Sequence, residues 1–152
     1  MDSSINDAAK VPELAGYAEK VKKAKANIIE AAEHFRAMIA DGRVPEAFTN
    51  ATPFLDMMGD TILGWMHVWQ LAIAHRKFTE LCSEKKATTP EERSRLIQEN
   101  AEAAFYSGKI HSAQFFLNKI LPIQEGKFLA LKNADVSPLE IEDCAYGEEV
   151  TQ

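Results

Sequence analysis

Residues 51–74, ATPFLDMMGDTILGWMHVWQLAIA, decide how this chain folds. The stretch is apolar on nearly every side, which is typical of a helix that its neighbours bury. It is long enough to suggest a membrane span, but it contains Asp56 and Asp60, and a charge at the centre of a membrane costs roughly 2.5–3.5 kcal/mol. Two glycines, His67 and Gln70 weaken the membrane interpretation further. We therefore interpret the stretch as the central helix of a soluble bundle.

The composition is that of a single globular domain. The 152 residues are enough to bury a core, and 46% hydrophobic and 26% charged residues are near the average for soluble proteins. A formal net charge of −6 argues against nucleic-acid binding, which usually requires a basic face. Cys82 and Cys144 are too few for a disulfide framework. No signal segment opens the chain, so we expect a cytoplasmic protein.

Apolar periodicity predicts two further long helices, one on each side of the central helix. In the first, apolar positions recur every seven residues, and an interleaved set completes a heptad seam of about four repeats. This seam consists of Leu14, Ala18, Val21, Lys25, Ile28, Ala32, Phe35 and Ile39. The seam of the third helix consists of Ile97, Ala101, Ala104, Gly108, His111 and Phe115.

Local signals mark the ends of these helices. Gly42 is the predicted C′ residue that ends the first helix, and Thr52, which precedes a proline, is the predicted N-cap of the central helix. Thr89 and Glu92 form a capping box that starts the third helix. Pro122 lacks a backbone donor and should end or kink it.

These observations predict an all-α fold with an antiparallel up-down-up arrangement. We expect long helices near residues 12–41, 53–85 and 90–121, and a short fourth helix over 123–133. A second capping box at 137–140 predicts a single turn. The domain division is a flexible arm at 1–10, a helical bundle domain at 11–142 and an acidic tail at 143–152.

Four residues are candidates for a metal site. Asp56, Asp60 and His67 share one stripe of the central helix, and His111 could face them from the third helix. Di-iron bundles, however, use glutamates from four helices with Glu-x-x-His pairs, and the sequence contains no such pair. We favour the interpretation in which the aspartates cap or pair with basic or backbone groups and His67 is a hydrogen-bonded core residue.

Two other features suggest chemistry only weakly. Cys82 lies near two lysines that could lower its pKa, but no histidine-bearing motif accompanies it, and we interpret it as an incidental helical cysteine. Trp65 and Trp69 share a helical face and could stack a flat ligand, although such pairs belong more often to a core or an interface. The sequence has no phosphate-binding glycine loop, nucleophile elbow or Cys-x-x-Cys pair. We therefore expect no catalytic, cofactor-binding or metal-binding residue.

Two blocks of the sequence consist mostly of packing residues: EAFTNATPFLDMMGD at 46–60, followed by Gly64-Trp65, and FYSGKIHSAQFFLNKILP at 105–122. They resemble, in the expected order, two helices of the C-terminal helical extension domain of the acyl-CoA dehydrogenase family. The resemblance covers roughly residues 12–142. Neither block contains a catalytic signature, so the resemblance identifies a domain and no activity of this chain alone.

The resemblance implies a parent enzyme that binds FAD and oxidises an acyl-CoA thioester to an enoyl-CoA, with its base and flavin in other domains. This chain would be a non-catalytic domain, or a separately encoded subunit, that packs on the catalytic core or on a second copy of itself. We expect it to hold no FAD and to have no dehydrogenase activity alone. The alternatives are a free-standing helical interaction module and a ligand- or metal-binding bundle.

The predicted bundle also makes predictions about burial. We expect a buried set of Leu63, Trp65 and Phe115 and an exposed set of Lys22, Glu33 and Glu99. A fourth helix of about 18 Å cannot cover three helices of roughly 45–50 Å, so part of the apolar circumference of residues 54–74 should lack an intramolecular cover. Exposed apolar patches larger than a few hundred Å² usually mark interaction sites. We therefore predict that the chain associates with itself or with an acyl-CoA dehydrogenase core.

Overall fold

The fold is all-α, as the sequence predicts. The computed structural model describes residues 1–133 and 135–147, and this part of the chain contains seven α-helices and no strand. The α-helices are α1 (Asp2–Ala9), α2 (Pro12–Ala40), α3 (Val44–Thr49), α4 (Ala51–Glu84), α5 (Pro90–Glu99), α6 (Ala101–Phe115) and α7 (Ile123–Lys132). Three shorter elements are the π-helical turn η1 (Phe116–Ile120) and the 3₁₀ turns η2 (Ser137–Leu139) and η3 (Asp143–Tyr146).

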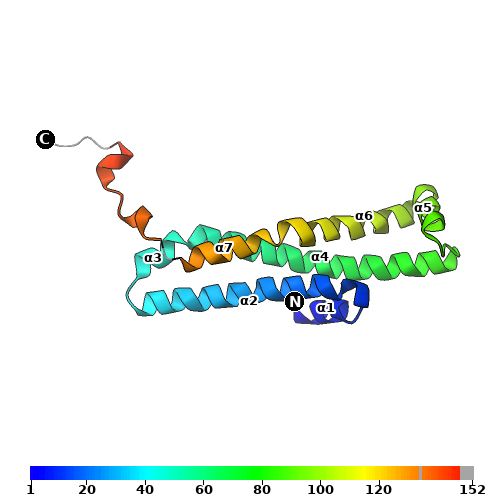
Figure 1. Cartoon of the computed structure of the whole chain (residues 1–152), viewed down its shortest axis with the longest axis horizontal. Coiled ribbons are helices and arrows are strands. Elements are labelled where there is room, and N and C mark those ends of the chain that lie inside the picture. The colour runs from blue at the N-terminus through cyan, green and yellow to red at the C-terminus, as the bar shows by residue number, and fades with distance from the viewer. Residues whose placement is uncertain (134, 148–152) are drawn as a thin grey trace.

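Helix α4 is the centre of the arrangement. Figure 1 shows α2 and α1 along one side of α4 and α6 with α7 along the other. Helix α5 folds over at the end of the molecule where α4 meets α6, and the segment after α7 leaves the body at the opposite end, beside α3 (Figure 1). The up-down-up arrangement follows from these contacts, with α6, η1 and α7 together forming the third layer.

The N-terminal segment is a helix, so the prediction of a flexible arm at residues 1–10 is wrong. Ile5 and Ala8 of α1 are each 1% exposed and pack against α2 and α4. Lys25 forms an ion pair with Asp2 at 2.6 Å. The helix signal in this segment is weak because α1 has only eight residues and buries only two of them.

The predicted seam of α2 is correct only in its first half. Leu14, Ala18 and Val21 are buried, whereas Ile39 is 50% exposed and Met38 takes the buried position. The buried face turns along the helix because its two halves have different neighbours. The first half packs in a cluster with α1, α4 and η1, and the second half in a cluster with α4 and α7.

The predicted third helix is interrupted. Asn100 has an extended backbone (φ −131°, ψ 116°), and its side chain accepts a hydrogen bond from the Ala103 amide, so it ends α5 and caps α6. Beyond this break α6 turns Ala103 and Ala113 toward the core. The predicted seam is therefore wrong, and its member Phe115 is 62% exposed.

Most of the predicted helix ends are correct. Gly42 has φ +79° after α2, with the Arg43 amide donating to the Met38 carbonyl, which is the Schellman arrangement. The capping box of Thr89 and Glu92 is formed in full. Pro122 separates η1 from α7, as expected. The start of α4 differs, because α3 occupies much of the gap between the helices predicted at 12–41 and 53–85, and Asn50, not Thr52, is the N-cap.

The tail prediction is tested only in part. Residues 137–139 form the expected single turn, but Asp135 rather than Ser137 supplies the side-chain acceptor there. Residues 143–146 form η3, and residues 148–152 lie outside the described part of the chain.

The core consists of two apolar clusters. The larger one joins α1, α2, α4, α6 and η1, and the smaller one joins α2, α4 and α7. Gly64 lets α4 approach Leu121 so closely that an added Cβ would lie 3.0 Å from a Leu121 methyl carbon. Leu63, which we expected in the core, is 48% exposed, and Trp65 is partly buried. Of the expected surface residues, Glu33 and Glu99 are exposed and Lys22 is half-buried.

Candidate interaction surface

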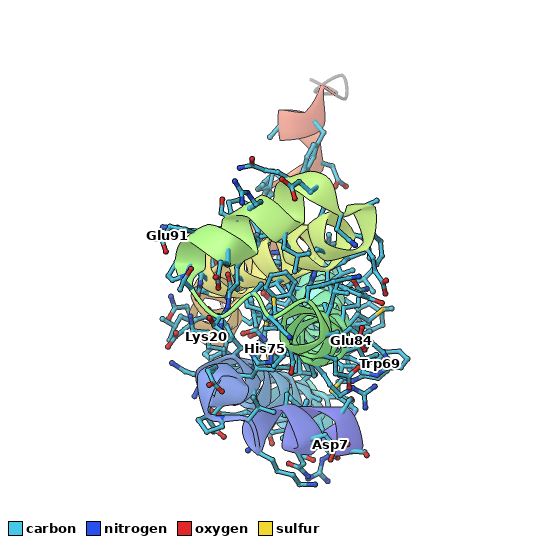
Figure 2. The ribbon with its side chains drawn as sticks, turned by 90° about the vertical axis from the view of Figure 1, so that its right-hand side faces the viewer. Asp7, Lys20, Trp69, His75, Glu84 and Glu91 are labelled. Carbon is cyan, nitrogen blue, oxygen red and sulfur yellow. The ribbon has the colours of Figure 1, made fainter. Side chains whose placement is uncertain are left out.

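One face of α4 is apolar and uncovered. It carries six large side chains that are between 36% and 66% exposed, and we call them the α4 stripe. The stripe consists of Leu55, Met58, Ile62, Met66, Trp69 and Ile73. Figure 2 looks along the helices and shows Trp69 pointing away from the body, to the side of α4.

The spacing of the α4 stripe makes it continuous. Its members recur at intervals of three or four residues, so at 100° per residue they lie within about 80° of the helix circumference. From Leu55 to Ile73 the stripe runs about 27 Å along the helix. This finding confirms that part of the apolar circumference of residues 54–74 lacks an intramolecular cover.

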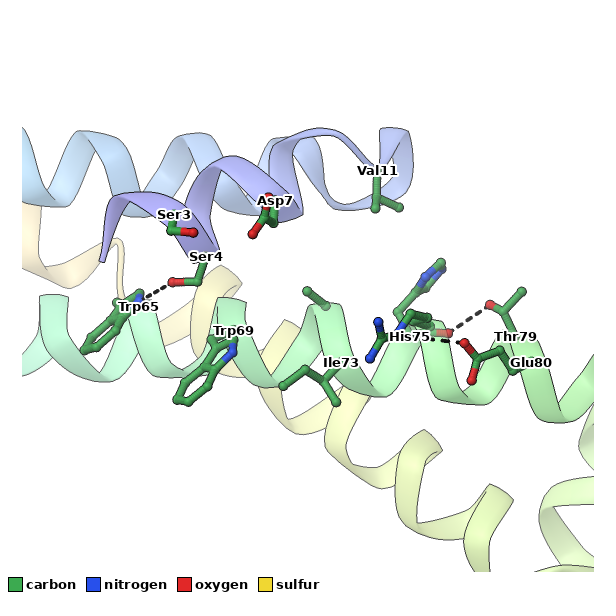
Figure 3. A pocket seen from close by; sticks show the side chains of 12 residues that line it. Ser3, Ser4, Asp7, Val11, Trp65, Trp69, Ile73, His75, Thr79 and Glu80 are labelled. Atoms are coloured by element: carbon green, nitrogen blue, oxygen red, sulfur yellow. Dashed lines mark hydrogen bonds and ion pairs between the residues drawn. The ribbon is translucent and has the colours of Figure 1, made fainter.

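A groove of about 780 Å³ lies at the C-terminal end of the α4 stripe, between α1 and α4. Figure 3 shows Ser3, Ser4 and Asp7 of α1 on one side and Trp65, Trp69 and Ile73 of α4 on the other. The two indole rings are nearly parallel, with centroids 6.4 Å apart. The Trp65 Nε1 donates a hydrogen bond to Ser4 Oγ at 2.6 Å, which ties α1 to α4.

The polar groups at the far end of this groove contact each other. The Thr79 hydroxyl donates to the His75 carbonyl oxygen at 2.9 Å, and Arg76 lies 3.9 Å from a carboxylate oxygen of Glu80. A small polar ligand is usually held by several convergent polar groups. Because the Thr79 hydroxyl and the Arg76 guanidinium already have partners within α4 and much of the remaining wall is apolar, the groove is better suited to an apolar protein surface.

The proposed metal-site residues do not come together. Asp60 forms an ion pair with Lys127 at 2.7 Å, and Asp56 and His111 are exposed. Among the residues that the structure describes, no group of three or more His, Cys, Asp or Glu side chains could hold a metal ion. The favoured interpretation, a paired aspartate, is confirmed for Asp60.

His67 differs from the expectation of a hydrogen-bonded core residue. Its ring stacks on Phe116 with centroids 4.5 Å apart, and its buried Nδ1 has no hydrogen-bond partner among the described residues. Burial, and to a lesser degree the charge of Lys109, lowers the pKa of His67 below its ordinary value. Burial therefore favours the neutral imidazole over the charged form.

The cysteines do not approach each other as a pair. Cys82 is buried in α4 and Cys144 is exposed in η3, and both are free thiols. The burial of Cys82 agrees with its interpretation as an incidental helical residue.

The groove could not be predicted without α1, which residues 1–10 signal only weakly. One wall of the groove is made of residues from the predicted flexible arm, and the α1–α2 junction adds Val11. The only signal of α1 in the sequence is the i,i+3 spacing of Ile5 and Ala8.

Within the described ranges, none of the helices is both long enough and apolar enough to cross a membrane.

The comparison with protein families agrees with the resemblance that the two blocks of packing residues carry. The model of the family described as "Acetyl-CoA dehydrogenase C-terminal like" matches residues 1–142, which include α1 and all of the α4 stripe. No curated protein and no solved structure matches the chain. Since the family model spans all but the last ten of the 152 residues, this chain belongs to the acetyl-CoA dehydrogenase C-terminal-like family of helical domains.

Proposed function

We propose that this chain is a non-catalytic helical domain, or a separately encoded subunit, of an FAD-dependent acyl-CoA dehydrogenase-like enzyme, and that its role is assembly. The observation that carries the proposal is the α4 stripe. An apolar face about 27 Å long on a soluble domain usually marks an interaction site. The family to which the chain belongs supplies the class of enzyme.

The parent enzyme would oxidise an acyl-CoA thioester to an enoyl-CoA in the cytoplasm and would hold FAD in other domains. Two features of this chain support a non-catalytic role. Its acidic and histidine side chains are dispersed, as the Asp60–Lys127 ion pair and exposed His111 illustrate. The groove beside the α4 stripe presents an apolar wall, and its Thr79 hydroxyl and Arg76 guanidinium already have partners within α4.

The catalytic part of the proposal is tested by an activity assay on the purified chain. We expect no turnover of acyl-CoA thioesters of short, medium or long chain length when FAD and an artificial electron acceptor are added. We also expect no flavin absorbance after the chain is incubated with FAD and desalted. Turnover of any of these thioesters by the chain alone would overturn the non-catalytic assignment.

The assembly part is tested by co-expression with the acyl-CoA dehydrogenase core encoded in the same or an adjoining reading frame. A tagged chain should bring the core and its flavin absorbance through affinity and size-exclusion steps. The Ile62→Lys variant places a charge in the α4 stripe and should reduce this recovery if the stripe itself contacts the core. Ile29→Lys, at a position that is 54% exposed on α2, is the matched control and should not.

A second candidate is a free-standing helical interaction module that shares the fold. The same α4 stripe supports this second candidate, because an apolar face can bind protein partners of many kinds. The co-expression experiment separates the two. A chain that self-associates but never recovers the catalytic core would support the free-standing module.

A further inference from the structure

We propose that the α4 stripe binds the α4 stripe of a second copy of this chain, with the two helices antiparallel about a two-fold axis near Met66. This inference rests on the proposed assembly role and names the partner. Two observations support it: the opposite charges at the two ends of the stripe, and the positions of small and large residues around Met66.

The two ends of the α4 stripe differ in charge. Before Leu55 and in the first turns of α4, residues 41–60 contain four acidic residues and one arginine. Arg43 pairs with Glu46 and Lys127 pairs with Asp60, which leaves Asp41 and Asp56 as the acidic groups without an ion pair among the described residues. Beyond Ile73, residues 75–86 contain four lysines and arginines and two glutamates. The segment 135–147 leaves the body at the acidic end (Figure 1) and adds four acidic residues and no basic one.

This charge distribution selects the orientation of the pair. Antiparallel helices place the acidic end of each copy beside the basic end of the other, whereas parallel helices would place like charges together. Complementary charges at the rim fix the register and orientation of an interface, and the apolar centre supplies most of the affinity. A self-complementary patch closes the assembly at two copies.

The residues around Met66 are also complementary in size. Gly59 and Ile73 are each seven positions from Met66, so a two-fold axis there places Ile73 of one copy opposite Gly59 of the other. Apart from the nearby backbone of α4 and the adjoining residues, no described atom lies within 4 Å of the position that a Cβ on Gly59 would occupy, so space is available for the isoleucine.

The same axis brings charged residues together at the rim. Asp56 is ten positions before Met66, and Arg76 and Lys77 are ten and eleven positions after it. Asp56 is exposed. The basic pair contacts only Glu80 within its own copy, at 3.9 Å from Arg76 and 3.1 Å from Lys77, among the described ion pairs.

The test is the mass of the full chain by sedimentation at about 1–100 µM, with far-UV circular dichroism to confirm the helical fold. The wild type should sediment at twice the 16.9 kDa chain mass. Met66→Lys should give a monomer with an unchanged helical spectrum, because it places two charges at the axis. Leu129→Lys, which changes a 58% exposed leucine on α7, is the matched control and should stay dimeric.

A charge exchange tests the orientation. Asp56→Lys and Lys77→Glu should each weaken the dimer by about tenfold, since each change creates two repulsive contacts in a symmetric pair. The double variant Asp56→Lys/Lys77→Glu should recover most of the wild-type dissociation constant. Recovery supports antiparallel pairing, and a double variant weaker than both singles would overturn it.

The outcomes also separate this inference from the assembly role. A monomeric chain that recovers the catalytic core through the α4 stripe would overturn the second copy as partner and leave the assembly role intact. A dimer that Met66→Lys does not affect would place the contact elsewhere and overturn the inference. A dimer that Met66→Lys disrupts, in a chain that never binds a core, would keep the inference and overturn the proposed parent enzyme.

Discussion

Asn27 and Gln124 are 97 residues apart in the chain, and their side-chain amides meet in the core, with Asn27 Nδ2 donating to Gln124 Oε1 at 3.0 Å. Gln124 is 1% exposed. Its own amide donates to the Ala24 carbonyl oxygen at 2.9 Å and to the Thr61 hydroxyl at 3.3 Å. This single side chain therefore joins α7 to both α2 and α4.

The first prediction concerns this amide pair. Gln124→Leu should destabilise the chain by about 1–3 kcal/mol, because it leaves the buried Asn27 amide without an acceptor. The double variant Asn27→Leu/Gln124→Leu should recover much of that loss, since replacing both partners with apolar groups removes the unsatisfied donor. The measurement is urea unfolding at one fixed protein concentration. Equal stabilities of the single variant and the wild type would show that the amide contributes nothing.

The second prediction concerns the close approach of α4 to Leu121. Gly64→Ala adds a methyl group 3.0 and 3.1 Å from the two terminal carbons of Leu121, whose side chain is itself buried. Overpacking of this kind costs about 1–3 kcal/mol. The control is Gly108→Ala in α6, where an added Cβ meets no described atom within 4 Å. In this control, the gain in helix propensity alone should stabilise the folded chain by up to about 1 kcal/mol.

Thermal melting of the two glycine variants distinguishes these effects. The melting temperature should rise for Gly108→Ala and fall for Gly64→Ala relative to the wild type. A rise of equal size in both variants would show that Leu121 moves aside without cost.

The fold class and most helix ends could be predicted because their signals are local. The apolar run at 51–74 requires neighbours on several sides, and the box of Thr89 and Glu92 satisfies free backbone donors wherever it occurs. Gly42 ends α2 because a residue without a Cβ adopts φ +79° at little cost. Each of these signals lies within a short stretch of consecutive residues, so it can be recognised without knowing the contacts that the rest of the chain makes.

The buried face of each helix could not be predicted with the same accuracy. Helix α6 has apolar residues on both sides, and the turn of its backbone at Asn100 decides that Ala113 faces the core and Phe115 faces water. The groove depends on α1, whose eight residues would be marginal as an isolated helix. Contacts between distant segments decide both features.

The third prediction concerns α1. Ile5→Ala should destabilise the chain by about 2–5 kcal/mol, because Ile5 is 1% exposed and the change leaves a cavity between α1, α2 and α4. Ile29→Ala on α2 is the matched control, since that side chain is 54% exposed and little burial is lost. Urea unfolding midpoints give both values. Similar midpoints for the two variants would restore the interpretation of residues 1–10 as a flexible arm.

The last prediction concerns pH and His67. Burial, with a smaller effect of Lys109, lowers the pKa of His67 from its ordinary 6.5 in the folded chain. Between the folded and the ordinary pKa, the unfolded chain binds more protons on this residue than the folded chain does. The resulting stability is fully present above pH 6.5 and is lost as the pH falls through the folded pKa.

The variant His67→Phe removes the titrating group and keeps an aromatic ring beside Phe116. The stability of this variant should therefore fall less than that of the wild type when the pH is lowered below 6.5. Unfolding midpoints in urea, measured at several pH values, give the two profiles. Parallel profiles would show that His67 binds protons equally in the folded and unfolded chains, because only a difference in proton binding makes the two diverge.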